Sequence, residues 1–164
     1  MSKIRVAVLT LIFTGVLTFV GYRFHNRPVA ASAASAAARP QTSEGLRQFM
    51  QSRVHQEYTF MSFTIWHDRP LTPEKMDSLA ASSLRVMEMS RELAGYSGAY
   101  KQQGWNVDDL KFFEEKRLQL SRVAEELNRA AKKRDSSQVI NFFMHLDSTC
   151  QSCHKRFRPD LQWI

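Results

Sequence analysis

The segment from Cys150 to His154, Cys-Gln-Ser-Cys-His, combines two thiols and an imidazole in one short stretch. This is the spacing at which a c-type haem is attached covalently. Each thiol can add to one of the two vinyl groups of a haem, and the histidine that follows can ligate the iron from one side. The chain has no other cysteine. The sequence therefore predicts one covalent haem c, held by Cys150 and Cys153, with His154 as an iron ligand.

Other sites also use a Cys-x-x-Cys pair. A thioredoxin-like redox pair usually lies at a helix N-terminus after a strand, whereas this pair lies inside a helical pattern with no strand before it. A structural zinc site needs four ligands, and Cys150, Cys153 and His154 supply three. Haem attachment is therefore favoured over a redox pair, a zinc site or a local disulfide.

Residues 1–38 have the pattern of an export segment. Lys3 and Arg5 precede an apolar run over residues 6–20, and residues 29–38 are almost all alanine and serine. A basic start, an apolar middle and a tail of small residues are typical of a signal peptide.

An uncleaved membrane anchor is the alternative, because residues 4–22 are about long enough to span a bilayer. In both cases the domain formed by residues 39–164 is exported. We expect a periplasmic protein, either soluble after signal cleavage or anchored to the inner membrane and facing the periplasm.

The basic balance of the chain comes mostly from the leader. The formal charge is +7, and residues 1–38 contain four basic side chains and no acidic one, which leaves +3 for the rest. This charge gives no reason to expect a nucleic-acid partner.

From residue 42 onward, apolar residues recur at spacings of three and four, which predicts helices. The predicted helices begin at Ser43, Thr72, Asn106 and Asp135 or Ser136, and end near His67, Gly95, Arg134 and Pro159. Four helices with mostly short connections predict an all-α, antiparallel up-down-up-down four-helix bundle.

The last helix carries the haem motif on its apolar face. Its stripe is Val139, Phe143, Leu146, Cys150, Cys153 and Phe157. The two cysteines therefore face the core. In an antiparallel bundle the end of this helix is level with the start of the first helix, where Leu46, Phe49 and Met50 lie.

The sixth iron position decides what such a haem does. A sulfur ligand gives a closed, electron-transferring haem with a raised potential, and Met50 is the methionine level with His154. The other methionine and histidine side chains are less suitable, because they lie at another level of the bundle, on another helix face, or less directly opposite His154. They are Met61, Met87, His55, His67 and His145. The alternative role of Met50 is core packing, for which methionine is well suited.

The run from Cys150 to Arg158, Cys-Gln-Ser-Cys-His-Lys-Arg-Phe-Arg, resembles the class II c-type cytochromes, which comprise cytochrome c-prime and cytochrome c-556. It matches every fixed position of the family pattern Cys-x-x-Cys-His-x-x-aromatic-Arg. The resemblance covers about residues 43–160. It implies a left-handed four-helix bundle, often a homodimer, with one covalent haem whose histidine ligand corresponds to His154.

The two branches of this family differ at the sixth position. The c-556 branch uses a methionine of the first helix, and the c-prime branch leaves the position open behind an apolar or aromatic shield. The corresponding residue is Met50 as a ligand, or Phe49 as a shield. The family often has an arginine four residues before that position, whereas Arg47 lies three residues before Met50.

Lys155, Arg156 and Arg158 cluster beside the motif. They can neutralise haem propionates or attract an acidic redox partner, and they also suit the negative end of a helix. The first helix is rich in aromatic residues, and a well-packed core explains this better than a subunit or membrane contact.

These residues predict a mono-haem electron carrier, not an enzyme, with an unidentified redox partner protein. The alternative is a five-coordinate haem protein that binds nitric oxide or carbon monoxide. A peroxidase-like activity is the weakest reading, because no distal histidine and arginine pair is visible at the level of the motif.

Overall fold

A computed structural model describes residues 42–96 and 104–158 of the chain. These residues belong to one compact unit, which spans Pro40–Ile164. The predicted export segment lies outside the described residues. Among the helices that the structure describes, none has both the length and the apolar character needed to cross a bilayer.

The described chain is helical, and no strand occurs in residues 42–96 or 104–158. The elements are α2 (Ser43–Phe49), η3 (Met50–Val54), α3 (His55–Trp66), α4 (Pro73–Glu92), η4 (Leu93–Tyr96), α6 (Val107–Lys132) and α7 (Ser136–Phe157). Because the residues at the junctions keep right-handed helical dihedrals, α2, η3 and α3 form one continuous rod. The prediction of an all-α fold is confirmed.

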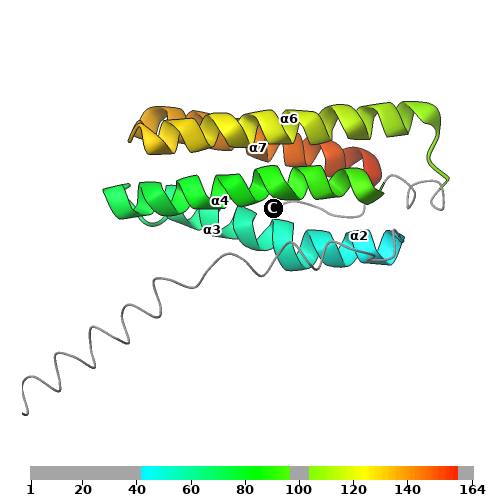
Figure 1. Cartoon of the computed structure of the whole chain (residues 1–164), viewed down its shortest axis with the longest axis horizontal. Helices are drawn as coiled ribbons and strands as arrows, with labels where there is room; N and C mark the ends of the chain where they lie inside the picture. Colours follow the sequence, from blue (N-terminus) through cyan, green and yellow to red (C-terminus); the bar gives the residue numbers. More distant parts are fainter. Residues whose placement is uncertain (1–41, 97–103, 159–164) are drawn as a thin grey trace, which may run out of the picture. The chain divides into compact units, whose positions relative to one another are not determined.

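The helices lie side by side and alternate in direction along the chain (Figure 1). The helix α6 packs against both α4 and α7, and α3 packs against α4. This arrangement brings the start of α2, the end of α4, the start of α6 and the end of α7 to the same end of the bundle. The haem motif therefore lies at the end where the sequence places it.

Side-chain caps fix where the helices begin. The side chain of Thr72 caps α4, which has proline at its first position, and the carboxylate of Asp135 caps α7. The first cap differs from the sequence prediction. Thr42, whose backbone is extended, accepts a hydrogen bond from the amide of Gly45, so Ser43 is already the first helical residue.

The start of α6 has a full capping box. The side-chain oxygen of Asn106 accepts hydrogen bonds from the amides of Asp108 and Asp109, both at 2.9 Å. The carboxylate of Asp109 in turn accepts a hydrogen bond from the amide of Asn106 at 3.1 Å. The same carboxylate accepts a bond from Arg156 of α7 at 2.8 Å. This cap therefore also ties the start of α6 to the end of the helix that carries the motif.

The core is built from the apolar stripes predicted along the helices. Its most deeply buried large side chains are Phe49, Met61, Ile65, Met76, Leu79, Leu127, Val139, Phe143 and Leu146. The stripe of α7 is therefore buried up to Leu146. Cys150, Cys153 and Phe157 continue the same face but are only partly buried, which marks the place where the packed core opens.

Replacing Asn106 by alanine should destabilise the bundle. Loss of the cap leaves two amides without their protein acceptor, and such losses typically cost about 1 kcal/mol. The midpoint of urea unfolding should fall accordingly. Asn141, an exposed residue inside α7, is the matched control, and Asn141→Ala should not lower the midpoint, because alanine is the better helix former at an exposed position. Equal shifts for the two variants would show that the capping box contributes nothing special.

Candidate functional site

A cleft opens at the end of the bundle where the core stripe of α7 stops. The space within it measures about 860 Å³, a figure that includes open solvent at its mouth. Its principal lining residues are Leu46, Arg47, Met50 and Val54 of the first rod, Leu93, Trp105, Phe113, Lys116, Arg117 and Leu120 of η4 and the α6 region, and Cys150, Cys153, His154, Phe157 and Arg158.

The cleft brings together most of the residues singled out in the sequence. Both cysteines, His154 and Arg158 line one wall from the end of α7, and Met50 lines the wall formed by the first rod. Cys150 and Cys153 are free thiols, and they share a helix face with the core stripe. Their roles in holding a haem, and the axial-ligand role of Met50, stay predictions that this geometry is compatible with.

Phe49 is placed differently. It does not line the cleft but is buried in the core, with only 2% of its surface exposed. Its ring lies 5.5 Å from the ring of Tyr96, and the guanidinium of Arg53 lies 5.0 Å above it. In this arrangement Phe49 supports the wall from behind, and Met50 is the residue of the pair that reaches the cleft.

The two thiols are in an environment that keeps them protonated. Burial raises the pKa of Cys150 to about 12, and that of Cys153 to about 11. Reactive redox cysteines have lowered pKa values instead, so the environment of this pair is unlike that of a thioredoxin-type site.

The environment of His154 favours a neutral imidazole. Burial, and then the nearby charge of Arg158, lowers the pKa of His154 below its usual value of 6.5. At neutral pH the ring therefore keeps the nitrogen lone pair that a metal ligand needs.

The charge of the cleft is one-sided. Arg47, Lys116, Arg117 and Arg158 contribute positive charges, and no aspartate or glutamate is among the described residues that line it. Most of the remaining lining is apolar. Such a site suits an apolar ligand that carries acidic substituents, and the porphyrin ring and two propionates of haem have this character. The thiols, the imidazole, the apolar walls and the cations together fit a haem.

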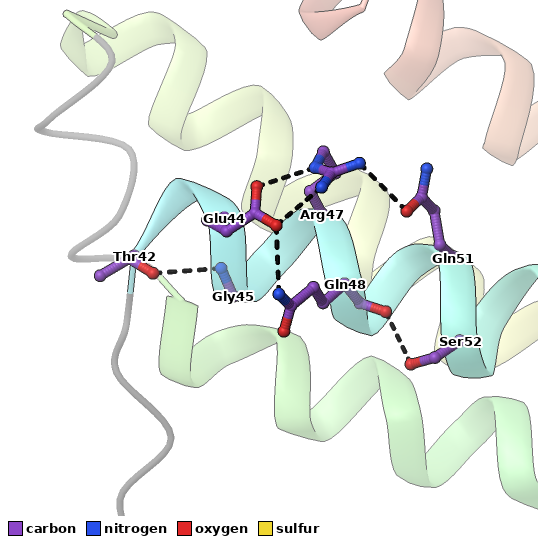
Figure 2. Close-up of polar contacts among 7 residues, drawn as sticks. All are labelled: Thr42, Glu44, Gly45, Arg47, Gln48, Gln51 and Ser52. Carbon is purple, nitrogen blue, oxygen red and sulfur yellow. Dashed lines mark hydrogen bonds and ion pairs between the residues drawn. The ribbon is translucent and has the colours of Figure 1, made fainter.

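One of these cations is already engaged on its own helix. Arg47 donates two hydrogen bonds to the carboxylate of Glu44, at 2.7 and 2.8 Å, and one to Gln51 at 3.2 Å (Figure 2). Gln48 donates to the same carboxylate. This polar network runs along the outer surface of α2. Arg47 is therefore held at the rim of the cleft, within hydrogen bonds that a ligand would have to rearrange.

Aromatic side chains close the end of the cleft. The rings of Trp105 and Phe157 are stacked with their centroids 3.8 Å apart, and Phe113 meets Phe157 edge-on at 6.2 Å. Arg156, next to Phe157, lies 4.7 Å above the ring of Phe112. Phe113 therefore lines the cleft, whereas Phe112 does not.

Lys116 and Arg117 were not foreseen as site residues. Two adjacent cations in a helix usually lie on a face exposed to water. Here the side chain of Lys116 is only 18% exposed, and that of Arg117 only 11%. One feature of the sequence could have identified Lys116 as a residue of the site. Lys116 lies three residues after Phe113 and four before Leu120, so it shares a helix face with both.

The comparison with known families rests on this same region. The sequence model of the family described as Cytochrome C' matches residues 99–158. The resemblance to the class II c-type cytochromes is confirmed. The matched part of the chain holds α6, α7 and the whole Cys150–His154 motif, and the family implies a covalently bound haem c. Searches of curated proteins and of solved structures each returned no match.

Covalent haem is the first property to measure. Protein purified from cells that mature c-type cytochromes should retain the added mass of haem after denaturation. The double variant Cys150→Ala/Cys153→Ala should lose it, because no thiol remains to form a thioether. Ser152→Ala, which changes a residue between the two cysteines, should keep it. Mass spectrometry under denaturing conditions gives the result, and an apo mass for the unaltered protein would contradict the haem assignment.

Proposed function

We propose that the protein is an exported mono-haem cytochrome that carries electrons and is not an enzyme, with His154 and Met50 as the axial iron ligands. The observation that carries this proposal is the position of Met50, which lines the same cleft as Cys150, Cys153 and His154 but comes from a different helical rod. Two ligands from separate walls can hold an iron between them.

The roles of the residues follow from their chemistry. Bound haem would supply a one-electron iron centre. Cys150 and Cys153 would fix the macrocycle to α7, and His154 would donate its neutral imidazole from the same helix. Arg158 and Arg117 offer guanidinium groups to the propionates. The apolar walls, including Leu46 and Val54, would exclude water from the iron.

Local backbone structure supports the assignment of Met50. This residue begins η3, where the amide of His55 bonds to the carbonyl of Met50, five residues back. Such π-helical turns are rare and frequently occur at functional sites. The thioether of Met50, only partly buried, gives the soft ligand that raises the potential of a haem and closes its sixth position.

A gas-binding haem protein is the second proposal. The matched family is described as Cytochrome C', and the c-prime branch leaves the sixth position open. Met50 would then only crowd the distal side, where carbon monoxide or nitric oxide could bind.

Location and partners belong to the same proposal. Proteins of this family are typically periplasmic, and the leader has the pattern of an export signal or anchor. Lys155, Arg156 and Arg158 lie exposed beside the cleft, where an acidic redox partner could dock. Phe60 and Phe63, exposed on α3, are the side chains that a homodimer could cover.

The optical spectrum distinguishes the two functions. If Met50 ligates the iron, the ferric protein should be low-spin and show the long-wavelength sulfur-to-iron band. Met50→Ala should abolish this band and allow the ferrous form to bind carbon monoxide at once. Met144→Ala is the matched control, because Met144 is 55% exposed on α7 and does not line the cleft. It should leave the spectrum unchanged.

A high-spin spectrum of the unaltered protein, with immediate carbon monoxide binding after reduction, would contradict electron transfer through a closed haem and favour the gas-binding alternative. A low-spin spectrum that Met50→Ala does not alter would assign the sixth position to another residue.

A further inference from the structure

Two charged side chains of opposite sign flank the positions where the haem would be attached. Lys116 reaches the cleft from α6 and lines it together with Cys153. Asp147 lies on α7 three residues before Cys150, so the two are neighbours on one face of the helix. A positive charge therefore lies on the side of one cysteine, and a negative charge on the side of the other.

The electrostatics of the two thiols reflect this asymmetry. The positive charge of Lys116 lowers the pKa of Cys153, opposing the larger effect of burial. The negative charge of Asp147 adds to burial in raising the pKa of Cys150, after the contribution of Cys153.

Both charges are held in place by neighbouring side chains. The amine of Lys116 donates a hydrogen bond to the side-chain oxygen of Gln119 at 3.0 Å and lies 5.3 Å from the centre of the Phe112 ring. The nearest carboxylate, that of Glu115, is 3.6 Å away, and its side chain is 68% exposed to water.

Asp147 is fixed by two donors. Its carboxylate accepts a hydrogen bond from the hydroxyl of Tyr58 at 2.8 Å and another from the amide of Gln151 at 2.7 Å. The ring of Tyr58 is itself stacked on Phe143 of the core, with centroids 5.7 Å apart. The carboxylate is therefore held at a defined position one turn before Cys150.

The geometry of haem separates these charges from its propionates. The vinyl groups that form the thioethers and the two propionates lie at opposite edges of the macrocycle. If haem is attached at Cys150 and Cys153, a cation beside Cys153 would lie at the thioether edge, away from the propionates. Arg117, the neighbouring cation, differs from Lys116 in its partners. Its guanidinium donates hydrogen bonds to the carboxylate of Glu114 and to the carbonyl of Ser90.

We propose that Lys116 and Asp147 are a pair of fixed charges that set the reduction potential of haem attached at Cys150 and Cys153, with opposite signs. This inference rests on the proposed haem attachment. Reduction adds one electron at the iron, so a nearby positive charge stabilises the reduced form and a nearby negative charge disfavours it. Charges and hydrogen bonds around a haem are known means of adjusting its potential.

The test compares midpoint potentials of holo-protein variants by redox titration. Lys116→Met keeps an unbranched side chain and removes the charge, and Asp147→Asn keeps the acceptor for Tyr58. Lys116→Met should lower the potential by an amount equal to about a tenfold change in the ratio of reduced to oxidised haem, ~59 mV for one electron. Asp147→Asn should raise it by a severalfold change in that ratio.

Two controls separate local charge from net charge and from packing. Lys111→Met removes the same charge from an exposed position of α6 and should change the ratio less than twofold. Lys116→Arg keeps the charge and should restore most of the potential. The effect of Lys116→Met should also persist at high salt, because partly buried charges are screened less than exposed ones. If Lys116→Met does not fold, Lys116→Gln is measured instead.

Shifts of the same sign in Lys116→Met and Asp147→Asn, or shifts no larger than that of Lys111→Met, would overturn the inference while leaving the haem assignment intact. A changed spin state in Lys116→Met would also overturn it, because Lys116 would then act through iron coordination. An unaltered protein without covalent haem would overturn the proposed function itself, and the inference with it. The denatured mass and the optical spectrum of each variant identify which case applies.

Discussion

The burial of one face of α7 determines the rest of the site. Val139, Phe143 and Leu146 are almost fully enclosed by the core, so the rotation of this helix about its own axis is fixed. Cys150 and Cys153 continue the same face at the same spacing, and they therefore point inward without any special local structure. What the inward face of α7 meets changes along the helix. Core side chains pack against its first half, and the cleft lies against its second half.

The cleft exists because the neighbouring helices change their side chains at that level. The helix α6 faces the core with Ala124, Leu127 and Ala131, all buried, but faces the cleft with Lys116 and Arg117. A cation cannot be buried there without a compensating anion or a hydrogen-bonding partner, and each of these two has side-chain partners beside it. The result is a site that is apolar on its walls and positive at its edge, open at the place where a dry core would otherwise continue.

Much of this arrangement follows from the sequence. The caps at Thr72 and Asn106 and the apolar stripe of α7 are local signals, and each is set by interactions within a few residues of the chain. The grouping of Cys150, Cys153, His154 and Met50 at one cleft follows from helix length and alternating direction. Lys116 was missed because its environment depends on which residues of other helices lie opposite, and no local pattern records that.

The first rod shows a second limit of sequence reasoning. A regular spacing of three and four treats Phe49 and Met50 as neighbours at one level, either of which could face the haem. The structure inserts the π-helical turn Met50–Val54 into the rod, and a π turn holds more residues per turn than an α-helix, so it shifts the faces on its two sides relative to each other.

The roles of Phe49 and Met50 differ for a simpler reason, because adjacent residues of a helix point about 100° apart. Phe49 ends α2 and is buried against Tyr96, whereas Met50 starts the π turn and lines the cleft. Arg47, three residues before Met50 rather than four, lies at the rim of the cleft, where it is bonded to Glu44. The helical step between these two residues therefore puts the thioether of Met50, and not the ring of Phe49, in the cleft, and the proposed closure of the sixth position by sulfur depends on that placement.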